Sequence, residues 1–137
     1  IEGGTPDLEV YGNGTVGVAY TRRVPGFPPK YWLTFLARQN GGLWQETAVE
    51  SIWGDLDVQL EFDQNGEPVL GYEGFDGVAV GVREGLSWQA FPVTTSGQPG
   101  VDRDLLVTPK HFHMVHTRKK SQRQDGLFYS RLCRDPQ

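Results

Sequence analysis

The chain has 137 residues, one cysteine and a net charge of −4, which argue against a protein that coats nucleic acid and exclude an internal disulfide framework or a cysteine-built zinc site. No apolar run approaches the ~20 residues that a membrane helix needs, so we expect no membrane span. Eighteen glycines and nine prolines favour short strands joined by tight turns over helices.

The first predicted element is a hairpin over residues 8–20. An Asn-Gly pair at 13–14 marks its turn, because both residue types tolerate the positive φ that tight hairpin turns require. A third strand is predicted over 32–38, and a fourth over 44–49, opening on a tryptophan that we expect to be packed. The four strands form one repeat over about residues 6–54.

The same pattern returns at a constant offset of 52 residues. A second hairpin spans 60–72 around another Asn-Gly pair, and further strands are predicted over 78–83 and 88–93, the last again opening on a tryptophan. These strands form a second repeat over about residues 55–100. Constant internal spacing is typical of repeat architectures.

A third, more divergent copy occupies about residues 101–137. It contains a hairpin over 105–116 and a strand over 127–133, and it ends at Gln137, before its expected tryptophan and fourth strand. Four strands per repeat of roughly 45 residues predict the blades of a β-propeller. We therefore expect an all-β chain, one propeller segment over 1–137 with two complete blades and a partial third; a β-sandwich of the same eleven strands is the alternative.

The second strand of each repeat is apolar on both faces. In the first copy Val18 and Tyr20 make a bulky face and Gly17 and Ala19 a small one, because side chains alternate along a strand. This pattern predicts sheets stacked with the large face of one against the small face of the next. Two and three-quarter blades cannot close a ring, so we expect other chains or missing blades to complete it.

The second repeat carries a resemblance. Its segment 60–72, followed by Gly85-Leu86-Ser87-Trp88, resembles a repeat found in bacterial and archaeal propellers. That repeat has Asp, Gly, Pro and Tyr at fixed spacing and a later Gly-x-Trp. Its blades are related in shape to those of sialidase-type (bacterial neuraminidase repeat) propellers. Gln39 and Arg83 stand where the sialidase Asp-box has its aspartate. The resemblance therefore implies the propeller fold and not sialidase activity.

All three histidines lie between residues 111 and 116. Strand parity puts His111 and His113 on one face and His116 on the other, so the three cannot converge on one ion, and we predict no metal and no cofactor. His116 stands where the other repeats have a packed tyrosine. The remaining alternatives are ordinary core and surface histidines, or an acid/base site. Cys133 is interpreted as a buried or inert thiol.

Two connections between second and third strands are basic. They cover residues 21–31 and 117–126 and are predicted as loops on the face where the blade junctions also bring acidic residues (Asp7, Asp55, Asp57, Asp102 and Asp104). An anionic ligand would meet the following cationic and stacking side chains: Arg22, Arg23, Lys30, Tyr31, Trp32, Arg118, Lys119, Lys120 and Arg123. The alternative is that these are solvated loops whose charge keeps the sheet ends soluble.

The leading hypothesis is a non-catalytic binding or scaffolding module that acts outside the cytoplasm and contacts an anionic polysaccharide or a protein partner through its basic loops. The runner-up is a carbohydrate-active enzyme, a polysaccharide lyase or glycosidase, in which His111 or His113 with Tyr129 handles an acidic sugar. No nucleophile or phosphate-binding motif supports another reaction class.

Overall fold

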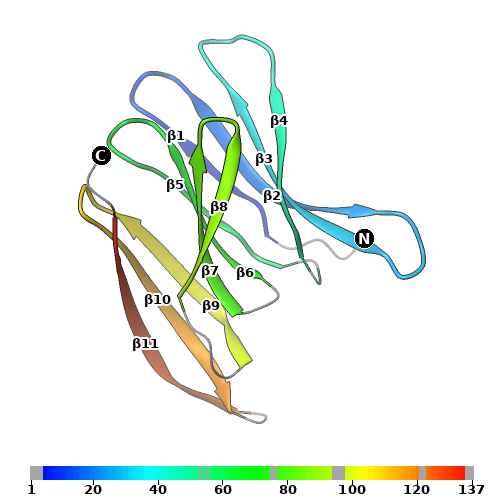
Figure 1. Cartoon of the computed structure of the whole chain (residues 1–137), viewed down its shortest axis with the longest axis vertical. Coiled ribbons are helices and arrows are strands. Elements are labelled where there is room, and N and C mark those ends of the chain that lie inside the picture. The colour runs from blue at the N-terminus through cyan, green and yellow to red at the C-terminus, as the bar shows by residue number, and fades with distance from the viewer. Residues whose placement is uncertain are drawn as a thin grey trace.

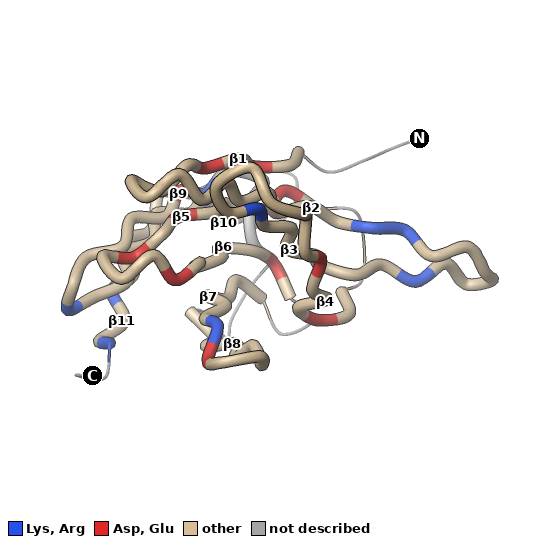
Figure 2. Tube along the Cα trace, turned by 90° about the horizontal axis from the view of Figure 1, so that it is seen from above, with Lys and Arg blue, Asp and Glu red and all other residues tan. Residues whose placement is uncertain are grey.

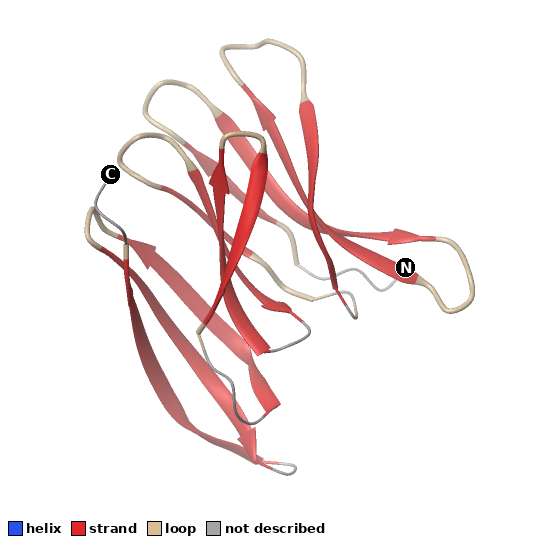
Figure 3. Ribbon diagram, in the orientation of Figure 1, coloured by secondary structure: helices blue, strands red, loops and turns tan. Residues whose placement is uncertain are grey.

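The computed structural model describes residues 5–52, 54, 56–74, 77–93, 98–120 and 123–134; at 98–102, 117–120 and 123–126 it describes the backbone alone. Every regular element among these residues is a β-strand (Figure 3), so the all-β prediction is confirmed. The described residues accordingly include no helix of the length and apolarity needed to cross a membrane.

Eleven strands form three antiparallel sheets in chain order (Figure 1). The first sheet has the order β1-β2-β3-β4: β1 (Asp7–Val10), β2 (Val16–Val24), β3 (Lys30–Arg38) and β4 (Gln45–Ile52). The second has the order β5-β6-β7-β8: β5 (Gln59–Phe62), β6 (Pro68–Gly74), β7 (Gly77–Glu84) and β8 (Ser87–Pro92). The third has the order β11-β10-β9: β9 (Gln98–Val107), β10 (His111–Lys120) and β11 (Arg123–Cys133).

Hairpins form at both Asn-Gly pairs as predicted, but only the glycine of each pair has a positive φ. Gly14 and Gly66 adopt φ of 87° and 78°, a region that side chains with a Cβ rarely enter. In the second turn Asp63 Oδ1 accepts hydrogen bonds from the backbone N–H groups of Asn65 (2.8 Å) and Glu67 (2.9 Å). The buried carboxylate thus replaces water around the turn and fixes the register of β5 against β6.

The strands around the two basic connections are longer than predicted. Loops were expected over residues 21–31 and 117–126, but β2 runs to Val24 before β3 begins at Lys30, and β10 runs to Lys120 before β11 begins at Arg123. The ladder continues because an antiparallel ribbon with water on its faces accepts charged residues. The loop prediction is therefore wrong for most of these residues.

The three sheets stack face to face, and their small and large faces meet as the sequence predicted. Gly17 of β2 lies so close to the second sheet that a Cβ built on it would be 2.8 Å from Phe62 Cζ. At the next boundary a Cβ on Gly71 would be 2.9 Å from the Met114 methyl group. A separate buried apolar cluster fills each boundary, so the second sheet is covered on both sides.

The sheets spread from a common edge. The first strands β1, β5 and β9 lie side by side, whereas the far strands β4 and β8 diverge (Figure 2). A two-layer sandwich would need the strands to belong to two sheets, and the described strands form three. The chain does not form the sandwich that the sequence left open.

Candidate contact surfaces

The β2–β3 hairpin projects from the first sheet as an arm, defined here as residues 21–31 (Figure 2). Phe27 near its tip is fully exposed, and Arg23 and Lys30 are exposed on its two strands. Among the described residues no carboxylate lies within ion-pair distance of Arg23 or Lys30. The arm therefore presents two cations and an aromatic ring to an incoming partner.

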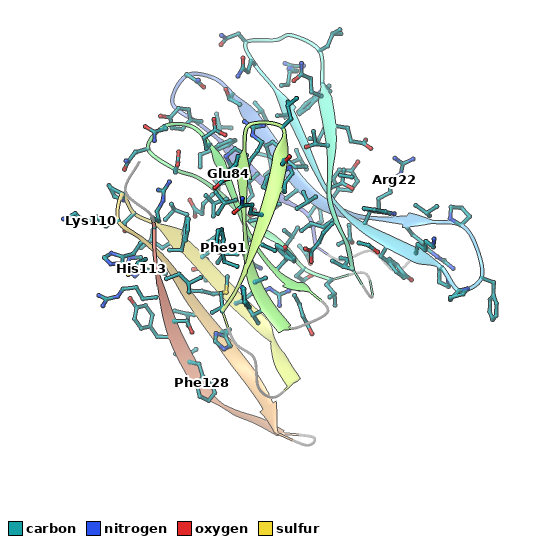
Figure 4. All side chains as sticks on the ribbon, viewed as in Figure 1. Arg22, Glu84, Phe91, Lys110, His113 and Phe128 are labelled. Atoms are coloured by element: carbon teal, nitrogen blue, oxygen red, sulfur yellow. The ribbon has the colours of Figure 1, made fainter. Side chains whose placement is uncertain are left out.

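Arg22, at the base of the arm, is already engaged (Figure 4). Its Nη1 donates to Glu46 Oε1 at 3.0 Å, and Tyr20 donates its hydroxyl proton to Glu46 Oε2 at 3.1 Å. Partial burial and the bond to this carboxylate raise the pKa of Tyr20. Arg22 is thus a weaker candidate for binding an anion than Arg23.

The two aromatic residues predicted as a stacking surface have different surroundings. Tyr31 packs against the buried cluster between the first and second sheets, whereas Trp32 is 37 % exposed on the opposite face of β3. Trp32 is therefore the more accessible of the two, because Tyr31 is partly buried.

The second basic segment lies on the third sheet. Arg118, Lys119 and Lys120 belong to β10 and Arg123 to β11, but their side chains lie outside the described part of the structure. The β10–β11 hairpin ends at the same end of the stack as the arm, on the opposite flank, with the second sheet between them (Figure 1). The two basic segments are therefore not brought together into one cluster.

His113 and Tyr129 are brought together. His113 Nδ1 lies 2.6 Å from the Tyr129 hydroxyl, and its Nε2 lies 3.3 Å from Thr108 Oγ1, so both ring nitrogens have partners. Tyr129 is 61 % exposed, and the pair lies on the face of the third sheet that points away from the second (Figure 4). A flat strand surface does not shield a substrate from water, as an acid/base site needs.

The strand-parity prediction for the histidines is confirmed. The ring of His111 lies 5.7 Å from that of His113, whereas His116 is buried on the other face and stacks on Phe128. Partial removal from water and the cations Arg131 and Lys110, together with His113, lower the pKa of His111. The described residues contain no group of three His, Cys, Asp or Glu placed to hold a metal ion.

The predicted rim acids connect the sheets to one another. Asp7 Oδ2 accepts a hydrogen bond from the Leu60 N–H (2.8 Å), and Asp57 Oδ1 accepts one from the Thr5 N–H (2.7 Å). Asp104 Oδ1 bonds the N–H that follows it in β9. The side chains of Asp55 and Asp102 lie outside the described residues.

Two buried cations also cross sheet boundaries, and the sequence did not identify them. Arg103 Nη2 donates to the Asp57 carbonyl oxygen (2.6 Å), with the Glu73 carboxylate 3.9 Å from Nη1. Burial raises the pKa of Glu73 and lowers that of Arg103. Arg134 pairs with Asp63 at 2.6 Å. Charge alone did not distinguish these residues from the exposed basic ones.

Two further sequence interpretations need correction. Cys133 is exposed, not buried, because it shares the outward face of β11 with Tyr129. Trp44 is 46 % exposed, with the Arg38 guanidinium over its ring, whereas Trp88 packs edge-on against Phe35 as expected.

Two cavities lined by described residues lie between sheets. One, of about 290 Å³, lies between the first and second sheets and has polar groups from Gln39, Gln45 and Arg83. The other, of about 130 Å³, lies between the second and third sheets against Phe91 and Phe112. Neither includes His113 or Tyr129. The residues that line the two cavities differ in polarity, so the cavities do not indicate one class of ligand.

Comparison with protein-family models, with curated proteins and with solved structures finds no match to this chain. The resemblance to sialidase-type propeller repeats therefore rests on the residues of this sequence.

Proposed function

We propose that the chain is a non-catalytic binding or scaffolding module built from two complete blades and a partial third blade of a β-propeller. The supporting observation is the stacking of the sheets: each small face lies against the large face of the next sheet, and the first strands share one edge. Sheets that spread from a common edge in this way are the geometry from which a propeller is built.

The contact surface of this module is the arm, and its ligand is an anionic polysaccharide. Arg23 and Lys30 supply charge that no neighbouring carboxylate neutralises, and Phe27 and Trp32 supply exposed rings. Because the whole chain carries a net charge of −4, attraction to a polyanion has to come from such a local basic feature. A secreted or extracytoplasmic setting belongs to the same proposal, since acidic polysaccharides are extracellular polymers.

The enzyme alternative has weaker support. His113 and Tyr129 are hydrogen-bonded and Arg131 lies opposite His113 in the ladder, yet all three lie on an open strand surface and not in a cleft, and the arm belongs to a different sheet. A lyase needs its base and its carboxylate-neutralising cation in one cleft. We therefore propose binding without turnover.

Retention of the chain by an immobilised acidic polysaccharide, such as polygalacturonate, tests the proposal. The double variant Arg23→Glu/Lys30→Glu is expected to lose most of its affinity, because attraction becomes repulsion at both cations. The matched control is Lys110→Glu/Arg131→Glu, which removes the same charge from exposed residues outside the arm.

Binding that falls with added salt, is lost in the arm variant and is kept in the control is the expected result. Absence of binding at low salt, or equal losses in both variants, would contradict the proposal. Depolymerisation of the polysaccharide by the parent chain, lost in His113→Ala, would replace it with the enzyme alternative.

A further inference from the structure

Both outer faces of the stack carry exposed apolar side chains among charged ones. On the first sheet this surface, called here the leading face, contains Leu8, Val10, Val16, Val18 and Tyr20. On the third sheet the corresponding surface, called the trailing face, contains Leu106, His113, Val115, Leu127 and Tyr129. Exposed apolar sheet faces of this extent mark interaction sites.

The leading face carries residues that the other two sheets bury. The strand registers place Leu8, Leu60 and Leu105 at one repeat position, and their exposed fractions are 59 %, 1 % and 2 %. Leu60 and Leu105 are covered because another sheet precedes each of them. Among the described residues no sheet lies against the face that carries Leu8.

The trailing face shows the converse. Leu33, Val78 and Leu127 share a repeat position, and their exposed fractions are 0 %, 1 % and 73 %. The first two are covered by the sheet that follows. Leu127 would be covered in the same way by a surface like the leading face, packed against the third sheet.

The sizes of the residues at the two faces are complementary. Within the stack, Gly17 faces Phe62, one of the smallest and one of the largest side chains. The residue equivalent to Gly17 on the trailing face is His113, and the residue equivalent to Phe62 on the leading face is Val10. His113 is larger than Gly17, and Val10 is smaller than Phe62. The size order is reversed, so a larger residue again meets a smaller one, as a tightly packed boundary requires.

Several polar groups on the two faces already have partners. On the trailing face, His113 bonds Tyr129 and Thr108 through its two ring nitrogens. On the leading face, Glu46 binds both Tyr20 and Arg22. Burial would leave these groups bonded. Arg131, which lies opposite His113 on the trailing face and has no ion-pair partner among the described residues, needs an acceptor from the incoming copy.

From these observations we infer that the chain associates head to tail with a second copy, the trailing face of one copy packing on the leading face of the next. The contact continues the stacking that already joins the three sheets within one chain. Such an association is heterologous, since each copy uses a different face toward each neighbour.

A specific hydrogen bond is expected at this boundary. Asp7 Oδ1 accepts the Leu8 N–H (3.0 Å) while its Oδ2 crosses to the Leu60 N–H of the next sheet (2.8 Å). Asp104 holds the same repeat position, and its Oδ1 accepts the Leu105 N–H (2.9 Å). Its Oδ2 would accept from a donor of the incoming copy other than the Leu8 N–H, which that copy's own Asp7 already holds.

Two single substitutions test the direction of association. Leu8→Glu places a charge on the leading face and Leu127→Glu on the trailing face, so each variant keeps one working face. Neither side chain is buried in the single chain, so both variants are expected to fold. Leu86→Glu is the matched control, because Leu86 is 98 % exposed in the β7–β8 turn and belongs to neither face.

Sedimentation velocity should give a parent mass well above the 15.3 kDa of one chain, and the same for the control. Each face variant alone should remain a single chain, whereas their equimolar mixture should form a pair that grows no further. A parent that stays a single chain at all concentrations would overturn the inference. So would self-association of Leu8→Glu alone, which indicates contact between like faces. Glycan binding by the arm is measured separately and does not depend on the result.

Discussion

The second sheet and the two outer sheets are built from the same repeat but have different surroundings. The second sheet is covered on both faces over β5–β7, where Leu60, Leu70 and Tyr72 are almost completely buried, whereas most of β8 is exposed. The first and third sheets are each covered on one face within a single chain. Position in the stack, and not residue type, therefore sets how much a side chain contributes to the folding of one chain.

The largest expected effect comes from one substitution made at equivalent positions. Leu60→Ala should destabilise the chain by about 2–5 kcal/mol, because it removes buried hydrocarbon and leaves a cavity. Leu8→Ala should cost at most about 0.5 kcal/mol, because Leu8 is mostly in water in a single chain. Urea denaturation at low protein concentration measures both. Equal losses would show that the leading face is covered even in the single chain.

The ion pairs provide a second test of the comparison. Arg134→Met should cost about 3 kcal/mol, because Asp63 is nearly fully buried and would lose its cation. Arg22→Met should cost at most about 1 kcal/mol, because both partners of the Arg22–Glu46 pair are well exposed. The measurement is again the free energy of unfolding, and a similar cost for the two changes would contradict the assigned burial of the boundary.

Close packing of the small faces gives an intermediate effect. Gly17→Ala should destabilise by about 1–3 kcal/mol, because the added methyl group would meet the Phe62 ring. Gly12→Ala is the control, since nothing lies within 4 Å of the Cβ position there. If the boundary is correct, Phe62→Leu should restore part of the stability lost in Gly17→Ala.

The smallest expected effect concerns the charge along the first strands. Burial, together with the carboxylates of Glu9, Asp104 and Asp7, raises the pKa of Glu61. A carboxyl group whose pKa is raised in the folded state stabilises the fold when the pH is below its ordinary pKa of about 4.3. This stabilisation is lost as the pH rises through the folded-state pKa. Glu61→Gln should therefore increase the melting temperature at neutral pH.

The gain in Glu61→Gln should disappear when the melting temperature is measured below about pH 4, where the carboxyl is protonated in both states. The same substitution at the exposed Glu84 is the control, with little change expected at either pH. A gain that persists unchanged at acid pH would mean that repulsion among these carboxylates is not its cause.

Much of the local structure was predictable from the sequence. Asn-Gly pairs located two hairpins because few residues tolerate the required φ, and alternation along β2, β6 and β10 assigned each side chain to a face. That alternation also separated His116 from His111 and His113. These properties depend on neighbours in the chain, so the sequence alone determined them.

Tertiary structure decided which faces are covered and which charges are paired. Leu33 and Leu127 occupy the same repeat position, yet only one is buried, because coverage depends on the sheet stacked above it. Arg134 and Arg23 are equally cationic, yet only Arg134 meets a carboxylate brought from a distant turn. Burial and charge pairing arise from contacts between residues far apart along the chain, which only the stacked sheets bring together.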